Sequence, residues 1–419
     1  MPTDNAGSFG RRSVLQGAAA ATVLGAGARR ALAASPVQMI SHRYPALEFW
    51  ASKMKTAIPG IDVNTQLVPF DKALELTTIA LSSKSDTLDI VYASDATFAN
   101  LAKNGWLRPV DDLWAKYQEE FKLGDHADNV VKAFTYNGHL YVIPTDINVM
   151  MLYYRKDLFD QAGKKPPGTI AEYQALAKSF NSPARAGTVD CLKPVDACMN
   201  EAHWYMNALG AGWFDADWRP IFNGDRGVHA IEALKETSRY AQRGFSSAAN
   251  DECMIAFQQD AATMGLQWAT RASAMDDAKQ SRVIGKIDWV APPQGGGRVS
   301  SSGYAISAFS KQDPDLLFRI VATASNEANM REGAALTVPP RRSILTDPAM
   351  QQKNRFYRAA AASIETALPF PALPEFYAVS EFIARRVVQA VTGEMAVKPA
   401  LDAAATETET FLKGRGYYQ

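Results

Sequence analysis

The 419-residue chain lacks the common short motifs of catalysis. None of its five histidines belongs to an HExxH sequence, and neither a phosphate-binding loop ending in GK[ST] nor a GxGxxG fingerprint occurs. Three serines precede Gly303, but a nucleophile elbow would require a glycine where Val299 stands. The sequence therefore favours a protein that is not an enzyme and that needs neither a cofactor nor a metal.

An excess of either charge is also missing. The chain has 44 basic and 44 acidic residues, and its 47% hydrophobic and 21% charged residues are ordinary for a globular protein. A neutral chain has no field that would hold nucleic acid, so we expect no nucleic-acid partner. At this length one hydrophobic core stops growing, which predicts two lobes or domains.

Residues 1–34 have the composition of an export signal. Arg11 and Arg12 precede a weakly apolar Ala/Gly run, and Ala31-Leu32-Ala33 forms a small-x-small cleavage site. The arginine pair resembles a twin-arginine signal, although departures at neighbouring positions leave the export route open. A disordered or amphipathic cytosolic N-terminus is the alternative. No later stretch has 18 consecutive apolar residues, so we expect a soluble protein exported to the periplasm.

Cysteine is scarce, with three residues in the chain. Cys191 and Cys198 flank a proline-containing, loop-like segment, whereas Cys253 stands alone. In an oxidising compartment two such thiols form a disulfide if their Cα atoms come within about 7 Å, and we expect this bridge. A metal site would need three or four clustered ligands, and only Asp190 and Asp196 lie nearby.

Alternating strand and helix patterns predict an α/β fold. The first half reads as strands near residues 37–40, 61–70 and 88–93, with helices from Pro45 to Lys55 and over 71–82 between them. Such repeats indicate a wound sheet with helices on both faces. Later helices are predicted over 169–180, 203–209, 226–243, 314–324, 358–367 and 376–392. Residues 255–264 and 267–274 are predicted as a helix and a loop, and 300–310 as a strand.

The most informative stretch is residues 136–177, YNGHLYVIPTDINVMMLYYRKDLFDQAGKKPPGTIAEYQALA. A turn at Gly138, an apolar segment ending at Pro144, the acidic Asp146, a second apolar run and a capped helix from Thr169 follow one another without a spacer. This order predicts a chain that crosses between two lobes. The succession x-G-x-L-Y-x-I-P, L-Y-Y-R-K-D-L-F and G-x-x-P-P-x-T resembles the corresponding crossing in family 1 extracellular solute-binding proteins of ABC importers.

The resemblance implies a two-lobed periplasmic binding protein fold of type II. Each lobe would be a wound sheet flanked by helices, with lobe I formed by residues 36–147 and 301–345 and lobe II by 148–300 and 346–419. Two or three crossing segments would act as a hinge that closes the lobes on a ligand. The implied function is that of a monomeric, periplasmic carbohydrate-binding component, which delivers a sugar, sugar derivative or polyol to the membrane permease of an ABC importer.

A sugar site needs polar side chains that orient hydroxyl groups and aromatic rings that cover apolar faces. In an open α/β sheet these residues lie on loops at the carboxyl ends of strands. The resemblance places the Asp95 loop in the cleft and Trp268 where the family often presents a stacking ring. The full candidate set is His42, Arg43, Ser94, Asp95, Asp146, Asn148, Trp204, Gln267, Trp268, Gly303, Tyr304, Arg341 and Arg342.

Several of these residues would also suit a role in holding the fold. His42 would cap the helix that starts near Pro45, and Asp95 would cap the helix that starts near Thr97. The carboxylate of Asp146 would bind the other lobe rather than a ligand. Arg341 and Arg342 would either pair with an anionic group of the ligand or form salt bridges across the lobe boundary. The basic residues of the candidate set hint weakly at an acidic or sulfonated sugar.

Two other functions stay open from the sequence. An exported carbohydrate-cleaving enzyme would use Asp95 and Asp146 as its pair of carboxylates. A receptor of the same fold would bind an anion, or ferric iron through the adjacent Tyr153 and Tyr154. These tyrosines lie in an apolar strand, where their rings face opposite sides of the sheet, which favours a packing role.

Overall fold

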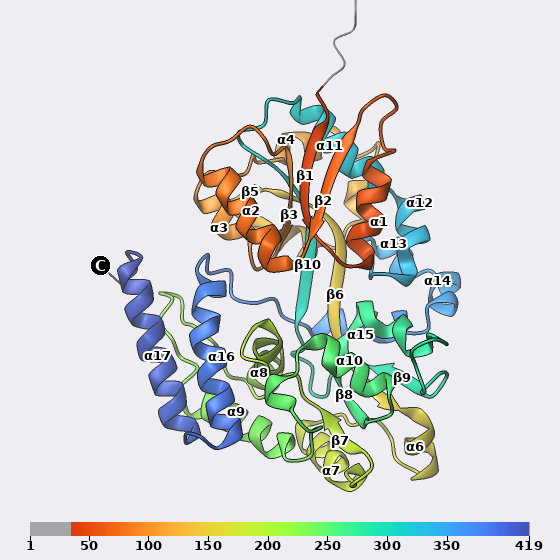
Figure 1. Ribbon diagram of the computed structural model, residues 1–419, viewed down its shortest axis with the longest axis vertical. Helices are drawn as coiled ribbons and strands as arrows, with labels where there is room; N and C mark the ends of the chain where they lie inside the picture. The colour runs from red at the N-terminus through yellow and green to blue at the C-terminus, as the bar shows by residue number, and fades with distance from the viewer. Residues whose placement is uncertain (1–34, 419) are drawn as a thin grey trace, which may run out of the picture. The chain divides into compact units, whose positions relative to one another are not determined.

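A mixed β-sheet of eight strands organises the part of the chain that the structure, a computed structural model, describes, namely residues 35–418. Neighbouring strands follow the order β2-β1-β3-β10-β6-β8-β7, and β9 also pairs with β6 (Figure 1). The strands are β1 (Val37–His42), β2 (Val63–Val68), β3 (Ile90–Ser94), β6 (Val142–Arg155), β7 (Ala186–Val189), β8 (Ala262–Trp268), β9 (Ile287–Val290) and β10 (Val299–Ile306). A separate hairpin joins β4 (Thr135–Tyr136) to β5 (His139–Leu140).

Strand β6 is shared by both ends of this sheet. Its residues 142–149 pair antiparallel with β10, and residues 150–155 pair antiparallel with β8 and β9. Strands β1, β2 and β3 run parallel beyond β10, whereas β7 and β8 run parallel at the opposite end. We use lobe I for the part around β1–β3 and lobe II for the part around β7–β9. The long β6 and its partner β10 connect them, as Figure 1 shows.

Helices surround each part of the sheet. Those of lobe I are α1 (Pro45–Met54), α2 (Phe70–Ser82), α3 (Phe98–Lys103), α4 (Asp111–Lys116), α5 (Asp128–Lys132), α11 (Pro314–Ala324), α12 (Glu327–Glu332) and α13 (Arg342–Leu345). Those of lobe II are α6 (Lys156–Gln161), α7 (Ile170–Phe180), α8 (Asp196–Ala208), α9 (Asp225–Ser238), α10 (Asn250–Gln258), α14 (Pro348–Lys353), α15 (Tyr357–Thr366), α16 (Phe376–Thr392) and α17 (Val397–Gly414). Short 3-10 turns are η1 (Leu123–Asp125), η2 (Phe245–Ser247), η3 (Ala269–Asp276) and η4 (Gly333–Ala335).

Local signals explain where several helices begin. The side chain of Asp313 accepts a hydrogen bond from the backbone N–H of Asp315, and Pro314 occupies the first position of α11. Thr169 and Glu172 form a reciprocal capping box at the start of α7. Both starts agree with the helices predicted from the sequence. The buried stripe of α11 packs against β10 and β6, which fixes the strand that returns to lobe I.

Strand β8 corrects one prediction. The sequence pattern predicts helix for residues 262–264 and loop for Gln267, but all lie in a strand whose seven residues are buried. A strand covered on both faces has a continuous apolar sequence, and periodicity cannot distinguish it from a buried helix segment. Helix α8 is also longer than predicted, because it starts at Asp196 instead of near His203.

The predicted disulfide is wrong. Cys191 is bonded to Cys253, with 6.1 Å between the Cα atoms, and Cys198 is a buried free thiol. Cys198 lies inside α8, where its thiol faces the carbonyl oxygen of Ala384 on α16 at 3.7 Å. The segment between Cys191 and Cys198 is therefore not the simple loop that the sequence pattern predicts. The bridge instead connects the chain after β7 to α10.

Candidate functional site

Asp146 lies on β6 where this strand passes from lobe I to lobe II, and it is fully buried. Tyr44 donates its hydroxyl hydrogen to Oδ2 of Asp146 at 2.8 Å, and Thr145 donates to Oδ1 at 3.0 Å. Burial raises the pKa of Asp146, and these hydrogen bonds offset part of that rise because they favour the charged form. No cationic side chain hydrogen-bonds to this carboxyl group among the described residues.

Hydroxyl groups surround Asp146. Ser302 on β10 is its partner in the strand register, and Oγ of Ser302 is 3.4 Å from the hydroxyl oxygens of both Tyr44 and Tyr92. Tyr44 and Tyr92 are half-buried, whereas Ser302 is buried. We call Ser41, Tyr44, Tyr92, Asp146, Ser302 and Tyr304 the hydroxyl cluster. Its accessible side is formed by the two half-buried tyrosines.

Aromatic rings flank the hydroxyl cluster. The ring of His42 makes edge contacts with Tyr44, Phe70 and Tyr92, at centroid distances of 5.1, 5.4 and 6.0 Å. Phe70, at the start of α2, also contacts Tyr377 of α16 at 5.9 Å. Because α2 belongs to lobe I and α16 to lobe II, this ring pair joins the two lobes. His42 does not cap α1, since Tyr44 is the N-cap residue.

Asp95 binds the start of the returning strand. Its Oδ2 accepts a hydrogen bond from Nη2 of Arg298 at 2.8 Å, and its Oδ1 accepts one from Ser300 at 2.9 Å. Asp95 therefore does not act as the N-cap of α3, whose N-cap is Thr97. Both carboxylate oxygens of Asp95 are therefore engaged within the protein.

Arg298 is a buried cation at the junction of the lobes, with 2% of its surface exposed. Its guanidinium carbon lies 4.0 Å from the ring centroid of Phe370, which adds a cation–π contact. The nearby His203 is buried, and burial and the charge of Arg298 lower its pKa to about 3, so that it is neutral. Nδ1 of His203 accepts from the indole N–H of Trp213, and Nε2 donates to the carbonyl of Leu368.

Asp196 is the first residue of α8. Its side chain is exposed, yet burial by the surrounding protein is the largest cause that raises its pKa. The charge of Asp196 interacts with that of Arg298 and also raises the pKa of Tyr92, so its carboxylate lies within electrostatic range of both residues.

Three other predicted residues, described next, lie on β6 and β10, the strands that also carry Asp146 and Ser302. Asn148 accepts a hydrogen bond from the backbone N–H of Thr270 at 3.3 Å, which ties β6 to the turn after β8. Tyr304 is fully buried, with its hydroxyl 3.3 Å from Oγ of Ser41. A Cβ atom at Gly303 would lie 2.1 Å from the carbonyl oxygen of Ile143, so glycine is required here by the approach of β10 to β6.

Several predicted residues serve mainly to hold the fold. Gln267 and Trp204 are buried and donate to the backbone carbonyls of Asn250 and Pro293. Trp268 is 5% exposed, which leaves little of its ring for stacking on a ligand. Ser94 is buried and hydrogen-bonds Thr97. Arg43 is exposed in the turn before α1.

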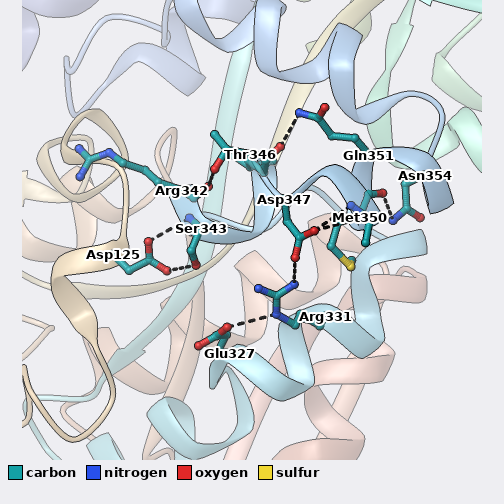
Figure 2. A network of polar contacts seen from close by, with 12 residues as sticks. Asp125, Glu327, Arg331, Arg342, Ser343, Thr346, Asp347, Met350, Gln351 and Asn354 are labelled. Atoms are coloured by element: carbon teal, nitrogen blue, oxygen red, sulfur yellow. Dashed lines mark hydrogen bonds and ion pairs between the residues drawn. The ribbon is translucent and has the colours of Figure 1, made fainter.

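The two adjacent arginines are not close to the hydroxyl cluster. Arg341 is buried and donates to the backbone carbonyls of Phe121 and Lys122 within lobe I. Arg342 is on the surface, paired with Asp128 at 2.9 Å. Figure 2 shows Arg342 in the polar network of α12–α14, in which Asp347 pairs with Arg331. Arg341 and Arg342 therefore no longer support the weak hint of an acidic or sulfonated sugar.

Sequence reasoning misses Tyr44, Tyr92, Asp196, Arg298 and Ser302. The candidate set contains Gly303 and Tyr304 of β10 but misses the amino end of this strand, which lies beside the carboxyl end of β3 because the two strands are antiparallel. Arg298 directly precedes β10, and the amino end of this strand is the signal that would point to it. Asp196 is not among the predicted ligand-binding residues, because the sequence pattern predicts that this helix starts near His203 instead of at Asp196.

A surface hollow of about 430 Å³ lies away from this site. It is lined by residues near the amino ends of β1 and β2, among them Gln38, Ile40, Asn64 and Gln66. Because an open α/β sheet forms its ligand crevice at the carboxyl ends of its strands, we do not consider this hollow the candidate site. Within residues 35–418, no group of three or more His, Cys, Asp or Glu side chains could hold a metal ion.

Comparison with known proteins gives consistent matches. The family model of bacterial extracellular solute-binding proteins matches residues 42–330. A mannitol-binding protein of Pseudomonas aeruginosa is 27% identical over 375 residues, covering 81% of this chain and 84% of that protein. Among the helices of residues 35–418, none is long and apolar enough to cross a bilayer.

Two solved structures share the fold. An ABC transporter solute-binding protein of Agrobacterium radiobacter in complex with ribitol superposes with a TM-score of 0.80 at 24% identity, covering 90% of this chain and 98% of that chain. One of Agrobacterium vitis with bound D-mannitol gives 0.78 at 23% identity, covering 92% and 100%. The fold is therefore that of two-lobed solute-binding proteins, as the sequence predicted.

Proposed function

Because the chain belongs to the family of bacterial extracellular solute-binding proteins, we propose that it captures a sugar or polyol between its lobes and delivers it to the permease of an ABC importer. The hydroxyl cluster around Asp146 is the observation that carries this proposal. Each ligand hydroxyl both donates and accepts hydrogen bonds, and the cluster presents the half-buried hydroxyl groups of Tyr44 and Tyr92, which hydrogen-bond the buried Asp146 and Ser302. The aromatic rings beside the cluster suit the apolar faces of such a ligand.

A polyol is the preferred ligand class in this proposal. The names of the relatives support it, since one is called mannitol-binding and two solved structures hold ribitol or D-mannitol. The half-buried rings of His42, Tyr44 and Tyr92 meet one another edge to face, so they form a small lining instead of a broad stacking platform. A short linear ligand suits such a lining better than a long oligosaccharide.

Closure of the two lobes is part of the proposed mechanism. We place the lobe boundaries near residues 147, 300 and 345, so that the crossing segments serve as the hinge. The contact between Phe70 and Tyr377 and the ion pair between Lys103 and Glu375 at 2.8 Å support this, because each joins lobe I to lobe II. Binding would favour the closed arrangement, since only there do both lobes contact the ligand.

The proposed place of action is the periplasm. The family consists of extracellular binding proteins. The proposed twin-arginine-like export signal, residues 1–34, lies outside the described residues. We further propose that the exported protein acts as a monomer and catalyses no reaction; the relatives and structural neighbours named above are binding proteins.

A thermal-shift screen of the purified protein tests the proposed function. The probes are D-mannitol, ribitol, D-sorbitol, D-glucose and maltose, each measured up to millimolar concentration. A ligand at 100 times its dissociation constant stabilises the folded state by about 2.7 kcal/mol, which raises the melting temperature measurably. Stabilisation by a polyol, confirmed by calorimetric titration, is the expected result. If none of these probes stabilises the protein, or if a bound probe is chemically altered, the proposal is wrong.

A further inference from the structure

Arg298 has unused hydrogen-bonding capacity at the candidate site. Of its three side-chain nitrogens only Nη2 has a partner among the described residues, namely Asp95, while Nε and Nη1 have no acceptor. A buried N–H group without an acceptor is costly, and more so when it belongs to a cation. The structure therefore has a buried donor next to the hydroxyl cluster that a ligand oxygen would satisfy.

The guanidinium group of Arg298 is held in position from both lobes. Asp95 of lobe I fixes one end through a 2.8 Å ion pair, and the ring of Phe370 in lobe II lies against its face at 4.0 Å. Both Asp95 and Arg298 have side chains that are almost inaccessible, at 5% and 2%. A donor fixed in this way loses little conformational entropy when a ligand binds, which favours recognition of a specific oxygen.

The charges around Arg298 are mostly negative. Asp95 already compensates Arg298, whereas Asp146 is hydrogen-bonded only to neutral hydroxyl groups. Asp196 is hydrogen-bonded to Asn200 at 2.8 Å, is exposed, and lies within electrostatic range of Arg298. A ligand carboxylate would be repelled by these groups and could not donate to them, whereas a hydroxyl group both accepts and donates.

Arg271 does not add an unpaired positive charge to this mostly negative surrounding. It lies close enough to Asp196 to affect its pKa, but its guanidinium group is paired with the exposed carboxylate of Asp251 at 2.8 Å. Arg298 and Arg271 are thus each paired with a carboxylate, whereas Asp146 and Asp196 form no ion pair among the described residues. His203 is neutral and adds no positive charge.

We infer that Arg298 and Asp196 select a neutral polyhydroxy ligand over the corresponding acid, because Arg298 donates to one ligand hydroxyl while Asp196 accepts from another. This inference rests on the proposed function and adds the class of ligand that the site takes. Arg298 is the donor that anchors the ligand. Asp196 is the residue that discriminates by charge.

The test uses matched ligand pairs in which one terminal CH₂OH group is replaced by a carboxylate. The pairs are D-mannitol with D-mannonate, ribitol with D-ribonate and D-glucose with D-glucuronate, titrated calorimetrically into the full chain. We expect the neutral member of the pair that binds best to bind at least tenfold more tightly than the acid. Equal or tighter binding of the acid would overturn this inference and leave the proposed function standing. Absence of binding by every neutral member would overturn both.

A substitution of Asp196 then tests whether this residue causes the preference for the neutral ligand over the acid. Asp196→Asn should reduce the preference for the neutral ligand about tenfold, because it removes the repulsion and keeps the side-chain size. Asp225→Asn is the matched control, since Asp225 is the exposed first residue of α9 as Asp196 is of α8. The control should leave the preference unchanged. An unchanged preference in Asp196→Asn would remove Asp196 from the inference.

Arg298→Lys keeps the charge but loses the planar donors, and it should weaken binding of the neutral ligand at least tenfold. Arg219→Lys is its control, because Arg219 also lies against an aromatic ring, that of Tyr418 at 4.6 Å, on the exposed surface. Unfolding midpoints without ligand show whether each variant folds. A folded Arg298→Lys protein with unchanged affinity would show that Arg298 only holds the lobes together.

Discussion

The disulfide between Cys191 and Cys253 leads to a quantitative prediction about stability. The bridge closes a loop with a sequence separation of 62 residues, and both cysteines are buried. The chain-entropy relation for a loop of this length gives about 14 cal/mol/K, or about 4 kcal/mol at 25 °C. Reduction of the bridge should therefore lower the free energy of unfolding by up to about 4 kcal/mol, because the unfolded chain gains the freedom that the bridge removed.

Urea denaturation followed by tryptophan fluorescence measures this effect with and without a phosphine reductant. For an m-value of about 3 kcal/mol/M the midpoint should fall by up to about 1.4 M. Cys253→Ala should show a low midpoint that the reductant no longer changes. Cys198→Ala removes the same side chain at a buried free thiol and should still respond to the reductant. Peptide mapping that finds a bridge from Cys191 to Cys198, or a reductant without effect on the midpoint, would refute this reasoning.

Three further predictions concern the site, the lobe contacts and pH. Tyr44→Phe removes a 2.8 Å hydrogen bond to Asp146 and should weaken polyol binding about tenfold in calorimetry; unchanged affinity would exclude Tyr44 from the site. Glu375→Gln breaks the pair with Lys103 between the lobes and should weaken binding of every ligand a few-fold, whereas Glu407→Gln, which affects a pair within lobe II, should not. Burial raises the pKa of both Asp190 and Glu201, so the folded state binds protons that the unfolded chain has released. The contribution of this pair to stability should therefore fall as pH rises from about 4 through the raised pKa values, and Glu201→Gln should shift the slope of stability against pH upward by up to about 1.4 kcal/mol per pH unit in urea titrations. An equal slope in the variant would contradict the coupling of this pair to folding.

The sequence predicted much of the fold because strong local signals mark it. The crossing segment contains Asp146, which pairs with Ser302 of β10, and β6 changes partners from β10 to β8 between Val149 and Met150. Helix α11 begins at the predicted Pro314 because a capping aspartate and a proline act at the same position. His42, Asp95 and Asp146 follow from the rule that polar site residues come after strands, and the structure brings them to one region around the hydroxyl cluster.

The remaining features depend on contacts that are distant in sequence. The partner of Cys191 is 62 positions away, and no local pattern in the sequence favours Cys253 over Cys198. Buried strand β8 has the same apolar composition as a buried helix segment. Arg298 is a candidate only because the structure places it between Asp95 and Phe370, which come from different lobes.

Ligand contacts and lobe closure are coupled in this arrangement because they share the same strands. Asp146 lies on β6, and Arg298 directly precedes β10, so groups that would hold a ligand also belong to the segments that join the lobes. Observed affinity then combines site contacts with the free energy of closing the lobes. A change at the Lys103–Glu375 pair alters only closure and should scale all affinities by one factor. A change at Asp196 alters the site itself and should change the ratio between neutral and acidic ligands.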